Sequence, residues 1–309
     1  MPDSKGNIDY SVIQCTEIHA TYRKKDGAFA SPKKYSFVTD DVTVTVTQII
    51  TRKISMVSKQ PVKVENLLAI HQNIEKLLML FDGQFYPIET VQFVGEGFDS
   101  LSVETDFRNR RLHFYQSDDF CQESCQLISD YNAVFNKTVY DKWVSILSEA
   151  DIMHQIFLYA NASGGFTKDV RLAFLIETAE SMIELVKENT KLFSSLKPGN
   201  GTSLKECIKG IIDEFGQDIF AREIQADNNG YATFLVKSKD SRVRIMHIKK
   251  NFQKDYFNPT EIILYLIKFS LLYRRVILEL LNIPYDSYKD NLCCVTKKWE
   301  NWYDNLKEK

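Results

Sequence analysis

Two short segments of the chain place an arginine and a histidine five residues apart. One pair is Arg242 and His247, in SRVRIMHIKK, and the other is Arg108 and His113, in RNRRLH. An arginine can hold two phosphate oxygens through its planar guanidinium group, and a histidine can take or give a proton near neutral pH. Because RNA carries its own nucleophile, the ribose 2′-hydroxyl, beside the phosphate it attacks, these two side chains could cleave it without a metal ion.

The spacing alone does not choose between the two pairs. With 11 Arg and 5 His in 309 residues, about 0.2 such pairs are expected by chance at any one spacing. Arg108 and His113 lie where the composition suggests strand and turn, and residues five apart in a strand point to opposite faces. We therefore interpret that pair as structural.

Arg242 and His247 lie in a segment with the pattern of a helix, where five residues turn the direction by about 140°. One such helix does not close a site around a phosphate. Two copies that meet across a two-fold axis could each supply an arginine and a histidine to a shared cleft. A core histidine beside a solvated arginine is the competing explanation.

Local charge draws attention to the same segment. The net charge of −2 gives no overall positive field, but residues 164–309 carry a net charge of +3 and residues 1–163 a net charge of −5. Residues 237–254 contain seven basic side chains and one acidic side chain, Asp240. This composition fits a surface that binds a polyanion, although a solvated helix face would have the same composition.

The composition is that of a soluble globular protein, with 44% apolar and 26% charged residues. The first ten residues lack the apolar segment of a signal peptide. The most apolar segment, residues 261–281, contains Lys268, Arg274 and Arg275, so we expect a buried core helix and no membrane partner. The six cysteines lack the spacing of a disulfide framework, and we expect a cytoplasmic location.

No motif indicates a cofactor or a metal ion. The phosphate-binding loop, the zinc-protease motif and the nucleophile elbow are absent, and Gly95-Glu-Gly97 predicts only a turn. Cys121, Cys125 and His154 could be gathered into a zinc site, but such sites usually need two well-spaced pairs of ligands. We therefore expect neither a metal ion nor a cofactor.

The periodicity of apolar residues changes from strand to helix along the chain. Residues 42–50 alternate valine with threonine, as in a half-buried strand, and residues 64–83 place apolar side chains at helical spacing before a terminal glycine. From Lys137 onward the pattern is helical. We predict an α+β protein, with a β-rich domain over residues 1–135 and an all-helical bundle over residues 136–309. Further strands are expected over residues 10–23, 52–59, 85–95 and 111–116, and helix caps at Ser203 with Glu206 and at Asn258 with Glu261.

The chain resembles a known family in three segments. The run FLVKSKDSRVRIMHIKKNFQ, followed by NPTEIILYLIKFSLLYRRVILELLNI, is similar to the end of an ApeA-like HEPN domain. That domain is a nucleotide-binding helical bundle marked by an arginine, four to six residues and a histidine ahead of a long apolar helix. VRLAFLIETAESMIEL is similar to an earlier helix of the family, with Glu180 at its acidic position. VKVENLLAIHQNIEKLLMLFDGQFYPI looks like the β-rich domain that precedes HEPN in ApeA-type proteins.

This resemblance implies a homodimeric, metal-independent endoribonuclease that leaves a 2′,3′-cyclic phosphate, with Arg242 and His247 as catalytic residues and Glu180 in support. It further implies abortive defence against phage, in which the N-terminal domain senses a phage-derived trigger, and structured RNA such as tRNA is the favoured substrate. Four nearby basic side chains would bind RNA phosphates without reading the sequence: Lys239, Arg244, Lys249 and Lys250.

The residue that follows the motif arginine departs from the family pattern. The family usually has a polar residue there, often Asn, and this chain has Val243. The departure favours an alternative, a HEPN protein of weak or no activity that binds RNA, a nucleotide or a partner protein.

Overall fold

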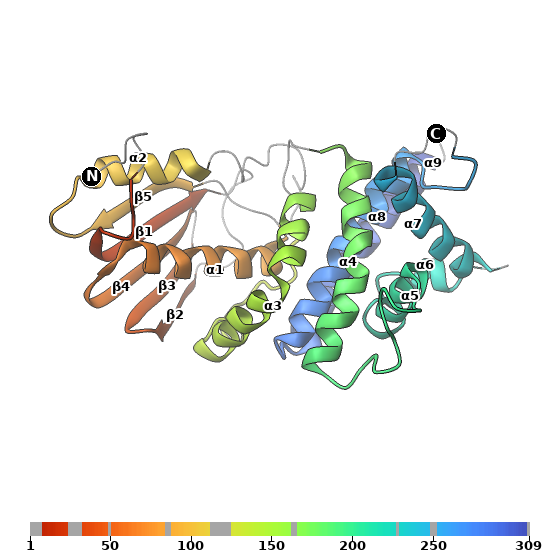
Figure 1. The fold of residues 1–309 in the computed structure, drawn as a ribbon, viewed down its shortest axis with the longest axis horizontal. Coiled ribbons are helices and arrows are strands. Elements are labelled where there is room, and N and C mark those ends of the chain that lie inside the picture. The colour runs from red at the N-terminus through yellow and green to blue at the C-terminus, as the bar shows by residue number, and fades with distance from the viewer. Residues whose placement is uncertain are drawn as a thin grey trace. The chain divides into compact units, whose positions relative to one another are not determined.

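The computed structural model describes residues 8–23, 33–48, 51–83, 88–111, 125–161, 166–226, 229–247 and 252–307. These residues form an α+β protein, in which antiparallel strands come first and helices predominate afterwards (Figure 1). They divide into two compact units, one up to Val144 and the other from Ser145 onward. The boundary falls within helix α3 (Lys137–Asn161), shortly after the division at 135/136 expected from the sequence.

The first unit is built on a five-stranded antiparallel sheet of order β2-β3-β4-β1-β5. Residues Val42, Val44 and Val46 are buried and the threonines between them are less so, which confirms the strand predicted from their alternation. Asp40 and Asp41 have positive φ angles of 47° and 59° in the tight turn between β2 and β3. The strands are β1 (Gln14–Arg23), β2 (Lys33–Thr39), β3 (Val42–Gln48), β4 (Thr51–Lys63) and β5 (Ile88–Val94).

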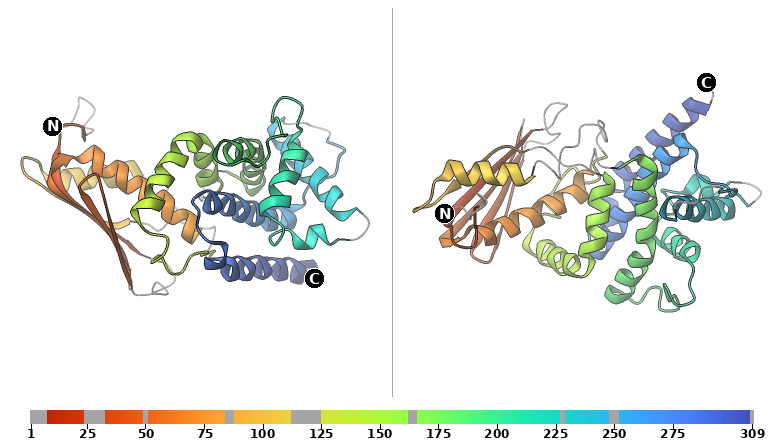
Figure 2. Two further views of the ribbon diagram at one scale, coloured as in Figure 1. Left: turned by 90° about the horizontal axis from the view of Figure 1, so that it is seen from below. Right: turned by 45° about the horizontal axis from the view of Figure 1, so that its top comes forward.

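Helix α1 (Val64–Asp82) packs on the sheet, as its helical spacing of apolar residues predicts (Figure 2). It ends at Gly83, whose φ of 75° suits a residue without Cβ and whose N–H donates to the carbonyl of Met79 at 2.7 Å. The His71 ring of α1 stacks at 6.1 Å from Tyr22 of β1 and meets Phe107 edge-on at 5.9 Å. One ring contact therefore joins the sheet to α1, and the other joins α1 to Phe107.

Helix α2 (Ser100–Arg111) corrects the expected strand and turn around Arg108. Asp99 caps the helix, because its carboxylate accepts hydrogen bonds from the N–H of Leu101 at 3.2 Å and the hydroxyl of Ser102 at 2.5 Å. Val103 and Phe107, four residues apart, are the buried anchors of this helix. His113 and most of the strand expected over residues 111–116 lie outside the described residues.

A buried ion pair joins β4, α1 and the segment that follows α2. The guanidinium of Arg52 donates to Asp82 at 2.6 Å and to the hydroxyl of Tyr131 at 2.8 Å, and that hydroxyl donates to Asp82 at 2.7 Å. The side chains of Arg52 and Asp82 are only 2% and 1% exposed. Burial of two charges is tolerated here because each charge has a close partner.

The second unit is helical, as expected from residue 137 onward, and α4 lies beside α5, α7 and α8 within it (Figure 1). The predicted capping box is present at Ser203 with Glu206, and the predicted cap residue Asn258 forms a capping box with Glu261. Besides the later part of α3, its elements are α4 (Lys168–Asn189), α5 (Leu204–Phe215), α6 (Ala221–Ile224), α7 (Gly230–Met246), α8 (Pro259–Leu280), η1 (Tyr285–Ser287) and α9 (Lys289–Lys307).

Helix α8 is the most apolar segment, and it is a buried core helix, as predicted. Its Lys268, 1% exposed, donates to Glu223 at 2.8 and 2.9 Å and to Glu300 at 2.6 Å. A buried lysine is therefore held by carboxylates from α6 and α9. In the described ranges, no helix combines the length and the apolar character that a membrane crossing requires.

The ion pair in the first unit gives a test of this packing. We expect Asp82→Asn to lower the free energy of unfolding of the first unit by roughly 3–5 kcal/mol, because it leaves the charge of Arg52 buried without its anion. Urea denaturation measures this loss. Asp41→Asn is the control, since Asp41 is 82% exposed and faces Lys59 at 3.7 Å, and its unfolding transition should not move. Equal effects of the two changes would contradict this account of Asp82.

Candidate functional site

Helix α7 carries the arginine of the motif and ends directly before the histidine. It packs through buried Phe234, Leu235 and Ser238 and begins after Asn229, which has a positive φ of 65°. Arg242 lies in its last turns, and His247 follows the last helical residue with a φ of −104°. The N–H of His247 still donates to the carbonyl of Val243 at 3.1 Å, so the helix end holds the histidine in place.

The structure brings Arg242 and His247 together within one chain. Nη1 of Arg242 lies 3.3 Å from Nε2 of His247. Because a guanidinium has no acceptor, Arg242 is the donor of this hydrogen bond and Nε2 of His247 is its acceptor. A separation of about 140° on a regular helix would not predict the contact. It arises because His247 lies past the helix end and the long arginine side chain reaches it.

Glu177 of α4 is the partner that the sequence analysis missed. Its carboxylate accepts from Nε of Arg242, and from Nη2 at 2.5 Å, so the two side chains form a two-point ion pair. This contact raises the pKa of Arg242 above its usual value, against the opposing effect of partial burial. Glu177 thus occupies the Nε–Nη2 edge of the guanidinium, and Nη1 contacts His247.

Glu180 lies one turn further along the same face of α4, where the sequence placed the acidic residue of the site. The two carboxylates are neighbours, and Glu177 rather than Glu180 takes the two-point contact with Arg242. Partial burial, followed by the charge of Glu177, raises the pKa of Glu180 above its usual value, and the charge of Arg242 opposes this shift. A supporting role for Glu180 stays a prediction.

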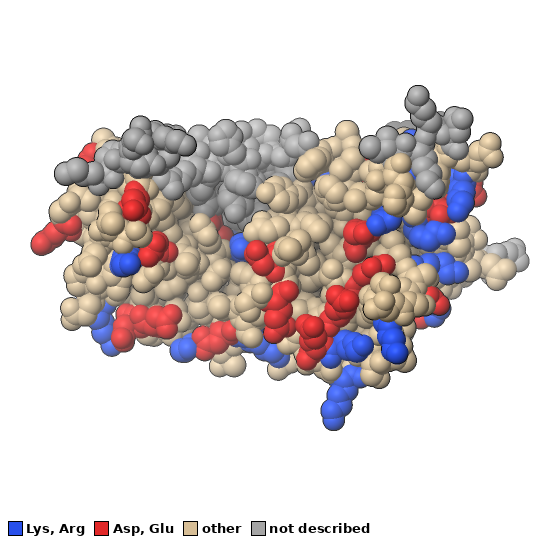
Figure 3. Space-filling model, viewed as in Figure 1, with Lys and Arg blue, Asp and Glu red and all other residues tan. Residues whose placement is uncertain are grey.

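Two of the four basic side chains expected to bind RNA lie among the described residues, and each has a contact with a neighbouring side chain. Lys239 lies 3.1 Å from Asp240, and the guanidinium of Arg244 stacks 4.0 Å from the centre of the Tyr256 ring. Lys249 and Lys250 lie outside the described residues. In Figure 3, acidic side chains lie over α4 and basic side chains over α7, so the two signs of charge are adjacent.

No cluster of three or more metal-ligating side chains occurs in the part of the chain that the structure describes. His154 is buried in the second unit, where its Nδ1 lies 3.0 Å from the hydroxyl of Tyr273. Cys125 is buried in the first unit, and Cys121 lies outside the described residues.

The raised pKa of Glu180 gives a test by pH. A folded-state pKa above the unfolded one makes the protein most stable below the unfolded pKa, and that stability is lost as the pH rises through the folded value. We expect Glu180→Gln to raise the thermal midpoint at pH 7 and to leave it unchanged below the usual pKa of 4.5. Glu188→Gln, at an exposed position of the same helix, controls for the loss of one negative charge. An equal shift of the Glu180 variant at both pH values would contradict the assignment.

Comparison of the chain with family models, with curated proteins and with solved structures finds no match in any of the three. The candidate site therefore rests on the contacts of Arg242, His247 and Glu177 and on the pattern of the sequence.

Proposed function

We propose that the chain is a metal-independent endoribonuclease of HEPN type, with Arg242 and His247 as its catalytic residues. The observation that carries the proposal is the 3.3 Å contact between Nη1 of Arg242 and Nε2 of His247. It places a group that can hold a phosphate beside a group that can take a proton. His247 is exposed, so a substrate can reach it.

The proposed reaction uses the free edge of the guanidinium. A phosphate that binds Nη1 and Nη2 of Arg242 displaces Nε2 of His247 from Nη1 and leaves that nitrogen free to act as a base. Nε2 takes the proton of the ribose 2′-hydroxyl, the 2′-oxygen attacks phosphorus, and the bond to the 5′-oxygen breaks. Glu177 holds the adjacent Nε–Nη2 edge of Arg242 and so keeps the plane of the guanidinium fixed.

The leaving 5′-oxygen needs a proton from a second group. In a homodimer, which we include in the proposal, the second copy of His247 supplies that proton as imidazolium, and the first copy ends the step protonated. The products are a 2′,3′-cyclic phosphate and a free 5′-hydroxyl. Structured RNA such as tRNA is the proposed substrate. The proposed setting is abortive anti-phage defence in the cytoplasm, with the β-rich first unit as the sensor of a phage-derived trigger.

A second candidate function is binding of RNA, a nucleotide or a partner protein without cleavage. The observation that favours it is that Glu177 already occupies two donors of Arg242, with Glu180 close by. Val243 also favours this candidate, since it lacks the polar side chain that the resembled family usually has next to the arginine. A protein that binds RNA but yields no cyclic-phosphate ends would support this candidate.

Replacement of the histidine tests the catalytic proposal. We expect His247→Ala to slow RNA cleavage by about 10²–10⁴-fold, because it removes the proton-transfer group. Cleavage is measured in EDTA by the appearance of 2′,3′-cyclic phosphate ends. His113→Ala, in the other Arg-His pair, is the control and should cleave at the parent rate. Undiminished cleavage by the His247 variant would refute the site, and a loss confined to the His113 variant would move it to the first unit.

Replacement of the arginine by lysine tests whether Arg242 must bind Glu177 and a phosphate at the same time. Lysine keeps the charge but lacks the planar fork that can bind Glu177 along one edge and a phosphate along the next, so we expect Arg242→Lys to slow cleavage by about 10²-fold or more. Arg222→Lys is the matched control, since Arg222 pairs with Asp304 through one nitrogen at 2.8 Å in the same unit. Full activity of the Arg242 variant would show that charge alone suffices and would contradict the geometry.

A further inference from the structure

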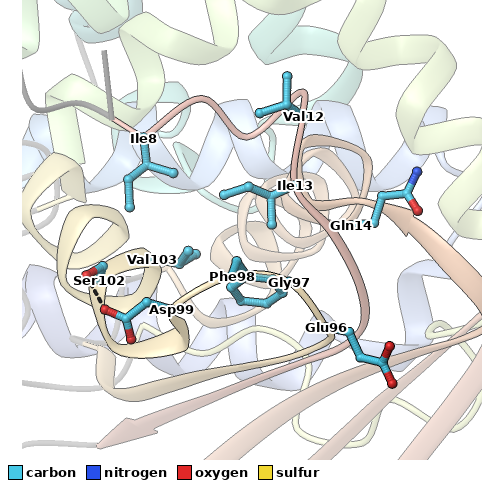
Figure 4. Close-up of a pocket in the computed structure, with 10 residues that line it drawn as sticks. All are labelled: Ile8, Val12, Ile13, Gln14, Glu96, Gly97, Phe98, Asp99, Ser102 and Val103. Carbon is cyan, nitrogen blue, oxygen red and sulfur yellow. Dashed lines mark hydrogen bonds between the residues drawn. The ribbon is translucent and has the colours of Figure 1, made fainter. Parts of the chain in front are cut away.

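A second feature with the character of a binding site lies in the first unit, away from the Arg-His pair. It is a half-open cavity of about 520 Å³ beside the start of β1 and the first turns of α2 (Figure 4). This volume falls within the range of small-molecule sites. Ile8, Ile13 and Val103 are buried in its floor, and the exposed side chain of Val12 lies at its edge.

The turn between β5 and α2 forms one wall, and its shape is fixed by close packing. A Cβ at Gly95 would lie 2.7 Å from both the carbonyl oxygen of Gln14 and the ring of Phe98, so only glycine lets the turn approach β1 this closely. Gly97 has a φ of 80°, and the hydroxyl of Ser100 donates to the carbonyl of Phe93 at 2.8 Å. The glycine pair that the sequence marks as a turn thus builds a preformed wall.

The described residues that line the cavity carry charge of one sign. Of its described lining residues, Glu96 and Asp99 are acidic and none is basic. Figure 4 shows Asp99 on one side of the apolar side chains and Glu96 on the other. The hydrogen bond from Ser102 holds the pKa of Asp99 below its usual value, so this carboxylate is ionised at neutral pH.

The carboxylates of Asp99 and Glu96 differ in their contacts. Asp99 is engaged as the cap of α2, by Leu101 and Ser102. Glu96 stands on the turn and is exposed, and no hydrogen bond or ion pair of Glu96 occurs among the described residues. A carboxylate beside an apolar floor can bind the ammonium group of a ligand whose carbon skeleton covers that floor.

We infer that this cavity binds a small amphipathic amine, with its apolar body on Ile8, Ile13, Phe98 and Val103 and its ammonium group at Glu96. The chemical class follows from the apolar floor and the negative rim together, since a neutral ligand would not use the rim and an anion would be repelled by it. This inference does not depend on the proposed ribonuclease activity.

Three probes of matched size test the ligand class on the full chain: 2-phenylethylamine, the neutral 2-phenylethanol and the anionic 3-phenylpropionate. We expect the amine to bind with a Kd on the order of 1 mM, as suits a ligand of this size. The alcohol should bind more weakly and the carboxylate should not bind. Saturation-transfer NMR titrations at low salt measure all three. Equal binding of the amine and the carboxylate, or no saturable binding of the amine, would overturn the inference.

Two variants place the binding in the cavity. Glu96→Lys should weaken binding of the amine by about fivefold or more. Glu214→Lys, at an exposed carboxylate of the second unit, should leave the affinity for the amine unchanged. Val12→Trp should block both the amine and the alcohol, and the fold tolerates it because Val12 is 66% exposed. Thermal midpoints equal to that of the parent confirm that the variants are folded. If either cavity variant binds the amine as well as the parent does, the ligand binds elsewhere and the inference is contradicted.

Discussion

A two-point contact between Arg242 of α7 and Glu177 of α4 sets the geometry of the candidate site. An arginine side chain at a helix end has several freely rotating bonds, and its free guanidinium would sample many positions. The carboxylate fixes the guanidinium plane, and the fixed plane directs Nη1 toward His247. The same contact explains why the site is polar but not strongly basic. One negative charge is built into it, and a second one, on Glu180, lies within electrostatic reach.

The strands and helices whose own residues show a clear pattern were predicted correctly. Helix α2 was not predicted, and there is a physical reason for this. Strand β3 and helix α1 carry clear periodicities, and the caps at Ser203 and Asn258 are recognisable from four residues each. Among the described side chains of helix α2, Val103 and Phe107 are the buried ones, and this apolar pattern is too sparse to distinguish the helix from a strand. The capping pattern that begins at Asp99 was the signal that could have found it.

The site was only partly predictable, because its partners come from separate helices. The motif identified Arg242 and His247, but their contact depends on where α7 ends. Glu177 and Glu180 share one face of α4, and the choice between them depends on the axial offset of two packed helices, which no local pattern encodes. Counting charges along residues 237–254 likewise missed the acidic side chains from other segments that pair with this one. One of them is Glu261, whose two carboxylate oxygens accept hydrogen bonds from Nζ of Lys237 at 2.8 and 2.9 Å.

The acids beside the motif bear on why the proposed enzyme needs two copies. A phosphate at the free edge of Arg242 comes close to the carboxylate of Glu177, and salt screens charges poorly at separations below about 8 Å. One copy therefore offers a substrate a single shared cation and one proton-transfer group. In the proposed dimer, a second motif facing the first would add another guanidinium to offset the repulsion and another imidazole to protonate the leaving oxygen. In the proposed dimer, association would control both RNA binding and cleavage, and under this proposal a lone chain would not cleave RNA.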